Sequence, residues 1–174
     1  DNKIICFHDF NLKNKFKVNR RIKDTNYNEI KKISLKFNSK VPLLEDLLKL
    51  NRSKLPLMIE IKPIFSKKNL IALLDKIKGI KNCCLTSFHE KNLINLSKLK
   101  KKLSLGIIFS KSTPVKKLML KSKKKHIKLL VVEKKFLKYP ELNKVDIPIF
   151  YYNLKGKDVF NKYKNVKNLI FENL

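Results

Sequence analysis

The sequence has few glycines, and this shortage narrows the class of protein. The 174 residues include three glycines, which are Gly79, Gly106 and Gly156. None of them stands in a glycine-rich phosphate-binding fingerprint, in which closely spaced glycines let the backbone approach a phosphate. This absence disfavours a nucleotide-binding sheet.

Cysteines and long apolar runs are also scarce. The three cysteines, Cys6, Cys83 and Cys84, have neither the spacing of a zinc site nor that of a disulfide framework, so we expect reduced, buried thiols in a cytoplasmic protein. No apolar run reaches the roughly 18 to 20 residues of a membrane-spanning helix, so we expect no transmembrane segment. The sequence opens at Asp1 in strand-like residues, and we expect a missing N-terminal segment, which leaves a signal peptide open.

Acidic residues and arginines are few in comparison with lysines. Lys and Arg number 42 and Asp and Glu 14, which gives a net charge of +28. This balance raises nucleic acid as a partner, but arginine, the residue favoured for bidentate recognition of phosphates and bases, occurs only at Arg20, Arg21 and Arg52. We interpret the lysines, densest at 98–102 and 121–125, as a solvated surface. We expect no specific nucleic-acid partner, although the charge can attract an anionic substrate.

The remaining composition and the hydrophobic pattern indicate an α/β protein. A hydrophobic content of 43% fits one globular domain of this length. Strand-like runs centre near residues 58, 84, 105, 129, 149 and 169, at intervals of roughly 20 to 26 residues, with helical patterns between them. Further short helices are expected after the capping box at 26–29, after Val41-Pro42, and over 158–163. The pattern predicts parallel βαβ units, and it fits both an open doubly wound sheet and most of an eight-stranded barrel.

One strand-like run carries charge. The segment Leu55–Pro63 reads Leu-Pro-Leu-Met-Ile-Glu-Ile-Lys-Pro, and Glu60 and Lys62 project to the same face because they are two residues apart. A buried carboxylate is costly unless it is paired or binds a metal. Two readings stay open here: an ion pair at the end of a strand, and a metal ligand beside a phosphate-binding cation.

Three features occur in a characteristic order. His8-Asp9 follows a short strand-like run at 3–7, Val41-Pro42-Leu43-Leu44-Glu45 precedes a helix, and Ile59-Glu60-Ile61-Lys62 ends a strand. In this order they resemble the glycerophosphodiester phosphodiesterase family, and Ser87-Phe88 and the run at 150–153 are weaker matches. The resemblance implies a TIM (β/α)8 barrel. Residues 1–174 would form one partial-barrel domain that lacks the first two strands and the first helix, with a basic insertion at about 10–40.

The resemblance also implies an activity. The family hydrolyses glycerophosphodiesters, small molecules, to an alcohol and glycerol 3-phosphate with the help of Mg²⁺ or Ca²⁺. His8 matches a histidine that acts in acid–base catalysis, Glu60 a metal ligand, and Lys62 a residue that binds a phosphate oxygen. The family's His-Arg-Gly and Glu-x-Asp segments would lie upstream, so we expect this chain to be a fragment that is inactive by itself. The alternative is a non-catalytic, degenerate barrel that binds phosphate or anionic head groups through its lysine-rich surface.

Other polar residues receive minor roles. Asp9 is expected to orient the loop that carries His8. We expect His89 to be a solvated loop residue and His126 to lie at the surface among lysines. Phe150 and Tyr151 stand where the family has Trp-Thr, which leaves recognition of the alcohol open.

Overall fold

The computed structural model describes residues 1–52, 54–155 and 168–171. The chain falls into two compact units, the first made of Asp1–Pro56 and Phe65–Asn82 and the second of Leu57–Ile64 and Cys83–Leu174. The prediction of a single domain over 1–174 stays a prediction, and the helix expected over 158–163 lies outside the described residues.

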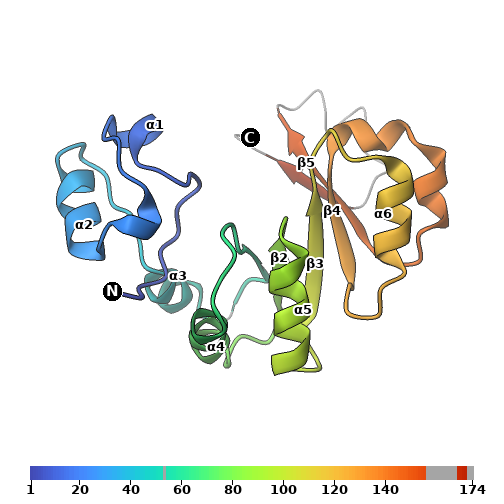
Figure 1. Cartoon of the computed structure of the whole chain (residues 1–174), viewed down its shortest axis with the longest axis horizontal. Coiled ribbons are helices and arrows are strands. Elements are labelled where there is room, and N and C mark those ends of the chain that lie inside the picture. The colour runs from blue at the N-terminus through green and yellow to red at the C-terminus, as the bar shows by residue number, and fades with distance from the viewer. Residues whose placement is uncertain (53, 156–167, 172–174) are drawn as a thin grey trace. The chain divides into compact units, whose positions relative to one another are not determined.

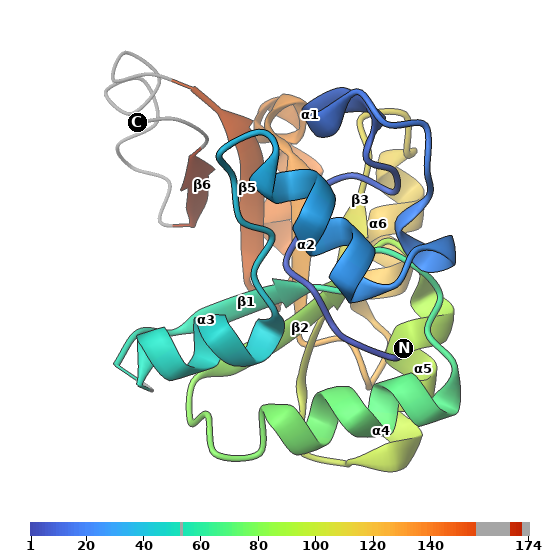
Figure 2. The ribbon, with the colours of Figure 1, turned by 90° about the vertical axis from the view of Figure 1, so that its left-hand side faces the viewer.

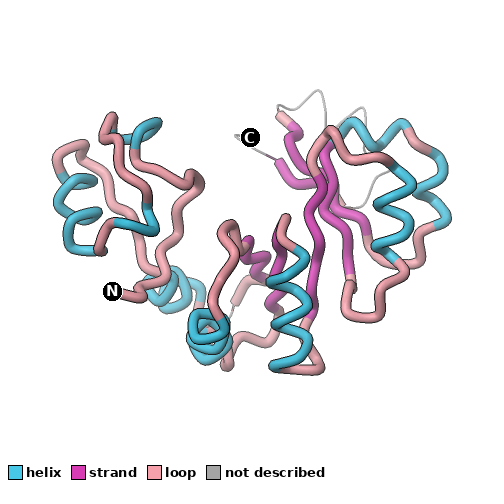
Figure 3. Tube along the Cα trace, in the orientation of Figure 1, coloured by secondary structure: helices cyan, strands magenta, loops and turns pink. Residues whose placement is uncertain are grey.

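The second unit is built on a six-stranded parallel sheet in the order β1-β2-β3-β4-β5-β6 (Figures 1 and 3). The strands are β1 (Leu57–Glu60), β2 (Cys83–Ser87), β3 (Ser104–Phe109), β4 (Leu129–Glu133), β5 (Ile149–Leu154) and β6 (Leu169–Phe171). The six strands expected near residues 58, 84, 105, 129, 149 and 169 are confirmed. Because neighbours in the sheet are also neighbours in sequence, the order never reverses as it does in a doubly wound sheet. The topology is that of consecutive barrel strands.

Two helices cover part of this sheet on one face. α5 (Glu90–Leu99) packs against β2 and β3, and α6 (Val115–Ser122) packs against β4 (Figure 1). Leu93 and Leu96 of α5 and Leu118 of α6 are fully buried, as expected for apolar residues on the inward face of a helix.

The short helix expected after β4 is instead a pair of 3₁₀ helices. These are η2 (Lys134–Lys138) and η3 (Pro140–Lys144). Pro140 lacks a backbone N–H and disfavours the helical conformation for the residue before it. Tyr139 accordingly has extended backbone angles (φ −102°, ψ 100°), and this break prevents a continuous α-helix.

The opposite face of the sheet carries its own apolar cluster. Ile108, Leu129 and Val131 are buried there, and Cys84 and Phe150 pack against them. Gly106 lies in the middle of this face, where a Cβ atom would stand 2.9 Å from both Leu129 Cγ and Thr86 Cγ2. Only glycine leaves room for these side chains, since real Cβ contacts are not so short.

The first unit consists of helices and loops (Figure 3). Its helices are α1 (Lys13–Phe16), the 3₁₀ helix η1 (Ile22–Asp24), α2 (Tyr27–Leu35), α3 (Leu44–Asn51) and α4 (Lys67–Lys76). The predicted cap of α2 is confirmed, because the Asn26 side chain accepts a hydrogen bond from the Glu29 N–H at 3.0 Å. The strand-like run at 3–7 forms no strand, and Ile5 makes an isolated bridge to Leu43. The core contains Leu12, Phe16, Ile30 and Val41.

Parallel strands of the second unit present their carboxyl ends at one edge of the sheet. Figure 2 shows β1 and β2 running side by side in the same direction, and Glu60 is the register partner of Thr86. Functional groups in βα folds gather at this edge. Glu60 ends β1 and Lys62 follows it, so both lie at this edge.

Candidate functional site

His8 lies in the first unit, in the loop after Ile5. Its side chain is 87% exposed, and Nδ1 lies 2.8 Å from Asp9 Oδ1. Asp9 in turn accepts a hydrogen bond at Oδ2 from Asn14 Nδ2 at 2.9 Å, so it orients this loop as expected. When Nδ1 donates to Asp9, the neutral ring presents Nε2 as the nitrogen that can accept a proton.

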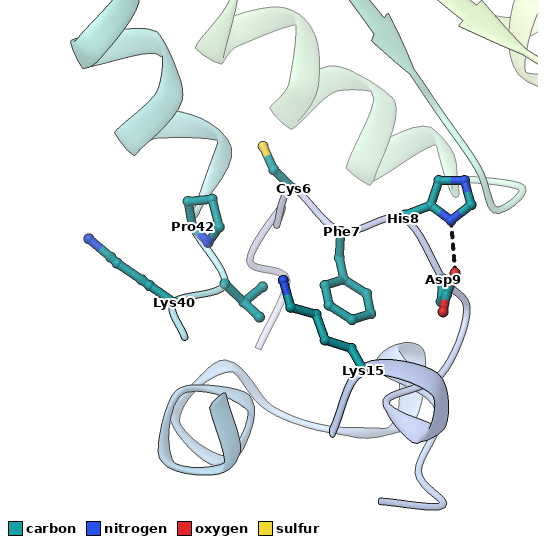
Figure 4. Close-up of a pocket in the computed structure, with 8 residues that line it drawn as sticks. Cys6, Phe7, His8, Asp9, Lys15, Lys40 and Pro42 are labelled. Atoms are coloured by element: carbon teal, nitrogen blue, oxygen red, sulfur yellow. Dashed lines mark hydrogen bonds and ion pairs between the residues drawn. The ribbon is translucent and has the colours of Figure 1, made fainter. Parts of the chain in front are cut away.

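A pocket of ≈ 200 Å³ adjoins His8 (Figure 4). It is lined by Cys6, Phe7, His8, Asp9, Lys15, Lys40, Val41 and Pro42. Lys15 and Lys40 bring positive charge to the pocket and Phe7 brings an apolar ring. Asp9 brings negative charge to the same lining.

Glu60 and Lys62 lie in the second unit at the carboxyl end of β1. Lys62 Nζ is 3.2 Å from a carboxylate oxygen of Glu60, and the side chains are 20% and 30% exposed. The structure thus contains the ion pair that was one of the two readings of this segment. Both groups remain partly open to solvent, and the lysine ammonium has further donors for a phosphate oxygen.

A buried hydrogen-bond network holds the backbone on both sides of Lys62. Ser87 Oγ donates to the Ile61 carbonyl at 2.6 Å. Asn92 Nδ2 lies 2.8 Å from the Pro63 carbonyl and 3.1 Å from Ser87 Oγ. Because Ser87 and Asn92 are fully buried, they fix the segment that carries the lysine.

The role of Asn92 was not predicted from the sequence. The available signal was its position on α5, four residues before Leu96, which places both residues on the buried face of the helix. A polar side chain on that face needs hydrogen-bond partners inside the protein. The family resemblance pointed to Ser87 but not to Asn92.

Glu133 and Tyr152 extend the polar edge of the sheet. They are register partners at the ends of β4 and β5, and the Tyr152 hydroxyl donates to the Phe109 carbonyl at 3.0 Å. Burial raises the pKa of Tyr152, and the carboxylates of Glu133 and Glu60 raise it further. Tyr152 therefore stays protonated near neutral pH and remains a hydrogen-bond donor.

Sequence analysis also missed Glu133 and Tyr152. Glu133 ends an apolar run in the same way as Glu60 does, which was the signal available for it. Tyr152 lies in the run compared with the family's Trp-Thr-Val-Asn, but its pairing with Glu133 depends on strand register. Register between strands cannot be read from either strand alone.

The described residues do not complete a site for Mg²⁺ or Ca²⁺. These ions require several oxygen ligands. Across residues 1–52, 54–155 and 168–171, no group of three or more His, Cys, Asp or Glu side chains is placed to hold a metal. Glu60 can supply carboxylate oxygens, and the metal requirement stays a prediction.

The other two histidines have local structural roles. His89 precedes α5, and its backbone N–H donates to Ser87 Oγ at 3.1 Å. His126 was expected at the surface, but its Nε2 is buried and has no hydrogen-bond partner among the described residues. Burial lowers the pKa of His126, and the charge of nearby Glu90 opposes this shift. The residue as a whole is half-buried, so the expectation of a surface position holds in part.

The described helices were compared with the length and apolar character of a membrane-spanning helix. Within the described part of the chain, none is long and apolar enough to cross a bilayer. This agrees with the absence of long apolar runs in the sequence.

Solved structures share the fold of this chain. A phosphodiesterase from Oleispira antarctica, determined with the product sn-glycerol-3-phosphate, superposes with a TM-score of 0.80 at 15% identity, over 98% of this chain and 75% of that one. A glycerophosphodiester phosphodiesterase from Parabacteroides distasonis gives a TM-score of 0.72 at 16% identity, over 96% and 73% of the two chains. No curated protein sequence matches.

The sequence pattern of the Glycerophosphoryl diester phosphodiesterase family matches residues 1–160. The matched range contains His8, Glu60 and Lys62, together with all strands of the sheet except β6. The chain therefore belongs to the glycerophosphoryl diester phosphodiesterase family.

Proposed function

We propose that this chain takes part in the hydrolysis of glycerophosphodiesters to an alcohol and glycerol 3-phosphate. The observation that carries the proposal is the partly exposed Glu60–Lys62 pair at the carboxyl end of a barrel strand, in a chain of this family. In the reaction, a water oxygen forms a bond to phosphorus and the bond from phosphorus to the alcohol oxygen breaks. One proton leaves the water and one reaches the departing alcohol.

The proposal gives each predicted residue a role that matches its chemistry. His8 transfers a proton, because an imidazole nitrogen can both accept and donate one and Asp9 holds the ring through Nδ1. Lys62 binds a phosphate oxygen and offsets its negative charge. Tyr152, whose single O–H donates to the Phe109 carbonyl, keeps the end of β3 in place beside this edge.

A divalent cation, Mg²⁺ or Ca²⁺, is part of the proposal. When bound, such an ion would neutralise charge on the phosphate, and Glu60 would provide one of its oxygen ligands. The described residues offer no complete ligand set. We propose that Glu60 is one ligand among several.

The test is the release of glycerol 3-phosphate from glycerophosphocholine by the protein that contains residues 1–174. We expect activity with added Mg²⁺ or Ca²⁺ and none after chelation. The variants His8→Ala and Glu60→Gln should each lower kcat at least 100-fold, a loss typical of a removed catalytic group. Lys49→Gln, an exposed lysine on α3, is the matched control. Full activity in both site variants would contradict the assigned roles.

A second candidate function is binding of phosphate or anionic head groups without hydrolysis. It is favoured by one observation, the lysine-rich surface of a chain in which 42 Lys and Arg outnumber 14 Asp and Glu. Calorimetric titration with sn-glycerol 3-phosphate separates the two functions. Binding that is insensitive to a chelator, with no hydrolysis under any metal condition, would favour this candidate.

A further inference from the structure

One stretch of the second unit carries lysines and no other charged residues except a histidine. Between Glu90 and Glu133 the sequence contains 13 lysines and no aspartate, glutamate or arginine. A composition bias towards lysine acts on the whole chain and does not by itself exclude acidic residues from one segment. The placement of these lysines in the fold is therefore informative.

The fold brings two lysine-rich connections together. One joins α5 to β3 and the other joins α6 to β4, and β3 and β4 are neighbouring parallel strands. The Lys128 N–H donates to the Leu105 carbonyl at 2.8 Å, which ties the second connection to the start of β3. Apart from Lys124, which pairs with Glu90, the exposed lysines here are Lys98, Lys100, Lys101, Lys102, Lys123, Lys125 and Lys128. We call these residues the lysine surface, and they lie at the amino ends of the strands.

The nearby carboxylate of Glu90 is paired with lysines outside the lysine surface. Glu90 forms ion pairs with Lys121 and with Lys124, the latter at 2.9 Å. Among the described residues, the lysine surface forms no ion pair with a carboxylate. Lysines near a helix C-terminus stabilise the helix dipole. That explains Lys98 in the last turn of α5, but not the lysines beyond the helix ends.

An exposed apolar side chain adjoins the lysine surface. Leu120 on α6 is 59% exposed, whereas Leu118 on the same helix is fully buried. Lys116 lies four residues before Leu120 and Lys123 three residues after it, which places all three on the same exposed side of α6 and its C-terminal end. A lipid surface offers an apolar layer for Leu120 and anionic head groups for the lysines that flank it.

We infer that the lysine surface together with Leu120 binds the surface of an anionic lipid bilayer. Lysines near a membrane are attracted by the negative potential of anionic lipids, and Leu120 can enter the region below the head groups. Nucleic acid fits less well. The stretch between Glu90 and Glu133 lacks arginine for base edges, and its single aromatic residue, Phe109, is buried and cannot stack on a base.

Within the second unit, the inferred membrane-binding surface and the proposed catalytic residues lie at opposite ends of the strands. The lysine surface lies at the amino ends of β3 and β4, whereas Glu60 and Glu133 end β1 and β4. The carboxyl ends of the strands would face the aqueous phase. Binding to a membrane does not depend on the proposed hydrolysis and can be tested without it.

The test is flotation of the full chain with lipid vesicles. We use phosphatidylcholine vesicles with and without about 30% phosphatidylserine, at about 0.15 M ionic strength. One variant replaces five lysines of the surface by glutamine, and a control variant replaces five exposed lysines of the first unit. The surface variant carries Lys100→Gln, Lys101→Gln, Lys102→Gln, Lys123→Gln and Lys125→Gln, and the control carries Lys31→Gln, Lys36→Gln, Lys49→Gln, Lys67→Gln and Lys68→Gln.

We expect binding to the anionic vesicles only, and a loss of at least tenfold in the surface variant but less than twofold in the control. The single variant Leu120→Gln should weaken binding severalfold, and it tests the inference even if the multiple variant fails to fold. Absence of binding to anionic vesicles, or equal losses in both lysine variants, would overturn the inference. So would binding of single-stranded RNA through the same lysines with no binding to vesicles.

Discussion

Two clusters of glutamate and lysine in the second unit differ in how they are built. Glu60 and Lys62 lie two residues apart on one strand, and both side chains are open to solvent to a similar degree. Glu90 instead begins α5 and binds Lys121, at the end of α6, and Lys124 beyond it. The first cluster lies at the edge of the sheet, and the second joins two helices.

This difference indicates different tasks. An ion pair within one strand end contributes little to the fold, because its partners are close in the chain whether or not the sheet forms. The Glu90 cluster brings together residues 31 positions apart, and it exists only when α5 and α6 are packed side by side. We therefore assign function to Glu60 and Lys62 and stability to Glu90.

The largest expected effect concerns Lys62. Lys62→Gln should lower kcat/KM for glycerophosphocholine about 100-fold, because the phosphate loses a charged donor. Its free energy of unfolding should change by less than about 1 kcal/mol, as for other partly exposed pairs. Lys62→Arg keeps the charge and should retain part of the activity. A variant that is unstable but fully active would reverse the assignment.

Glu90→Gln should lower the stability of the protein and leave its activity nearly unchanged. The two lysines around it would lose the counter-charge that links α5 to α6, so we expect a loss of about 1 kcal/mol in the free energy of unfolding. Urea unfolding followed by circular dichroism measures this loss. Glu141→Gln, on an exposed residue of η3, is the control. Activity of the folded variant should stay within about twofold of the original, since Glu90 lies outside the strand ends.

Asn92→Ala removes hydrogen bonds that hold the backbone next to Lys62, but it leaves the charge of Lys62 unchanged. Removing the amide leaves the Pro63 carbonyl and Ser87 Oγ without this donor, and we expect a loss of about 1 to 2 kcal/mol in stability. We also expect KM to rise more than kcat falls, since a misplaced lysine weakens phosphate binding. Asn92→Gln, which keeps the amide, should restore part of the affinity. An unchanged KM would mean that Asn92 supports only the fold.

The smallest effect is the pH dependence of the Glu90 cluster. Burial by itself raises the pKa of Glu90, but hydrogen bonds from Lys121 and Lys124 and their charges outweigh it, so the pKa is lowered. Stability from this group is therefore present above the pKa of the unfolded chain and lost as the pH falls through the folded value. The difference in unfolding free energy between the original protein and Glu90→Gln should shrink from pH 7 to pH 4. A difference that grows on acidification would contradict this account.

The sequence predicted the sheet well because its strands are apolar runs separated by helical patterns. It also predicted that Glu60 and Lys62 share a face, since that depends only on the two-residue period of a strand. Ser87 was identified as a weaker match to the family. These are all local features of the sequence.

The parts that could not be predicted depend on contacts between distant residues. The ion pairs of Glu90 and the pairing of Glu133 with Tyr152 arise only after helices and strands pack. In the first unit, α1 spans four residues and is too short to show helical periodicity. The burial of Leu12 and Phe16 around it therefore had no signal in the hydrophobic pattern.

The most direct test of the central claim is a paired measurement on Glu60→Gln and Glu90→Gln in the protein that contains residues 1–174. For each variant, we would measure release of glycerol 3-phosphate from glycerophosphocholine with Mg²⁺ or Ca²⁺, and the free energy of unfolding. The account predicts that Glu60→Gln lowers hydrolysis at least 100-fold and keeps stability, whereas Glu90→Gln keeps hydrolysis and loses stability. Hydrolysis that survives in Glu60→Gln at the original rate would contradict it.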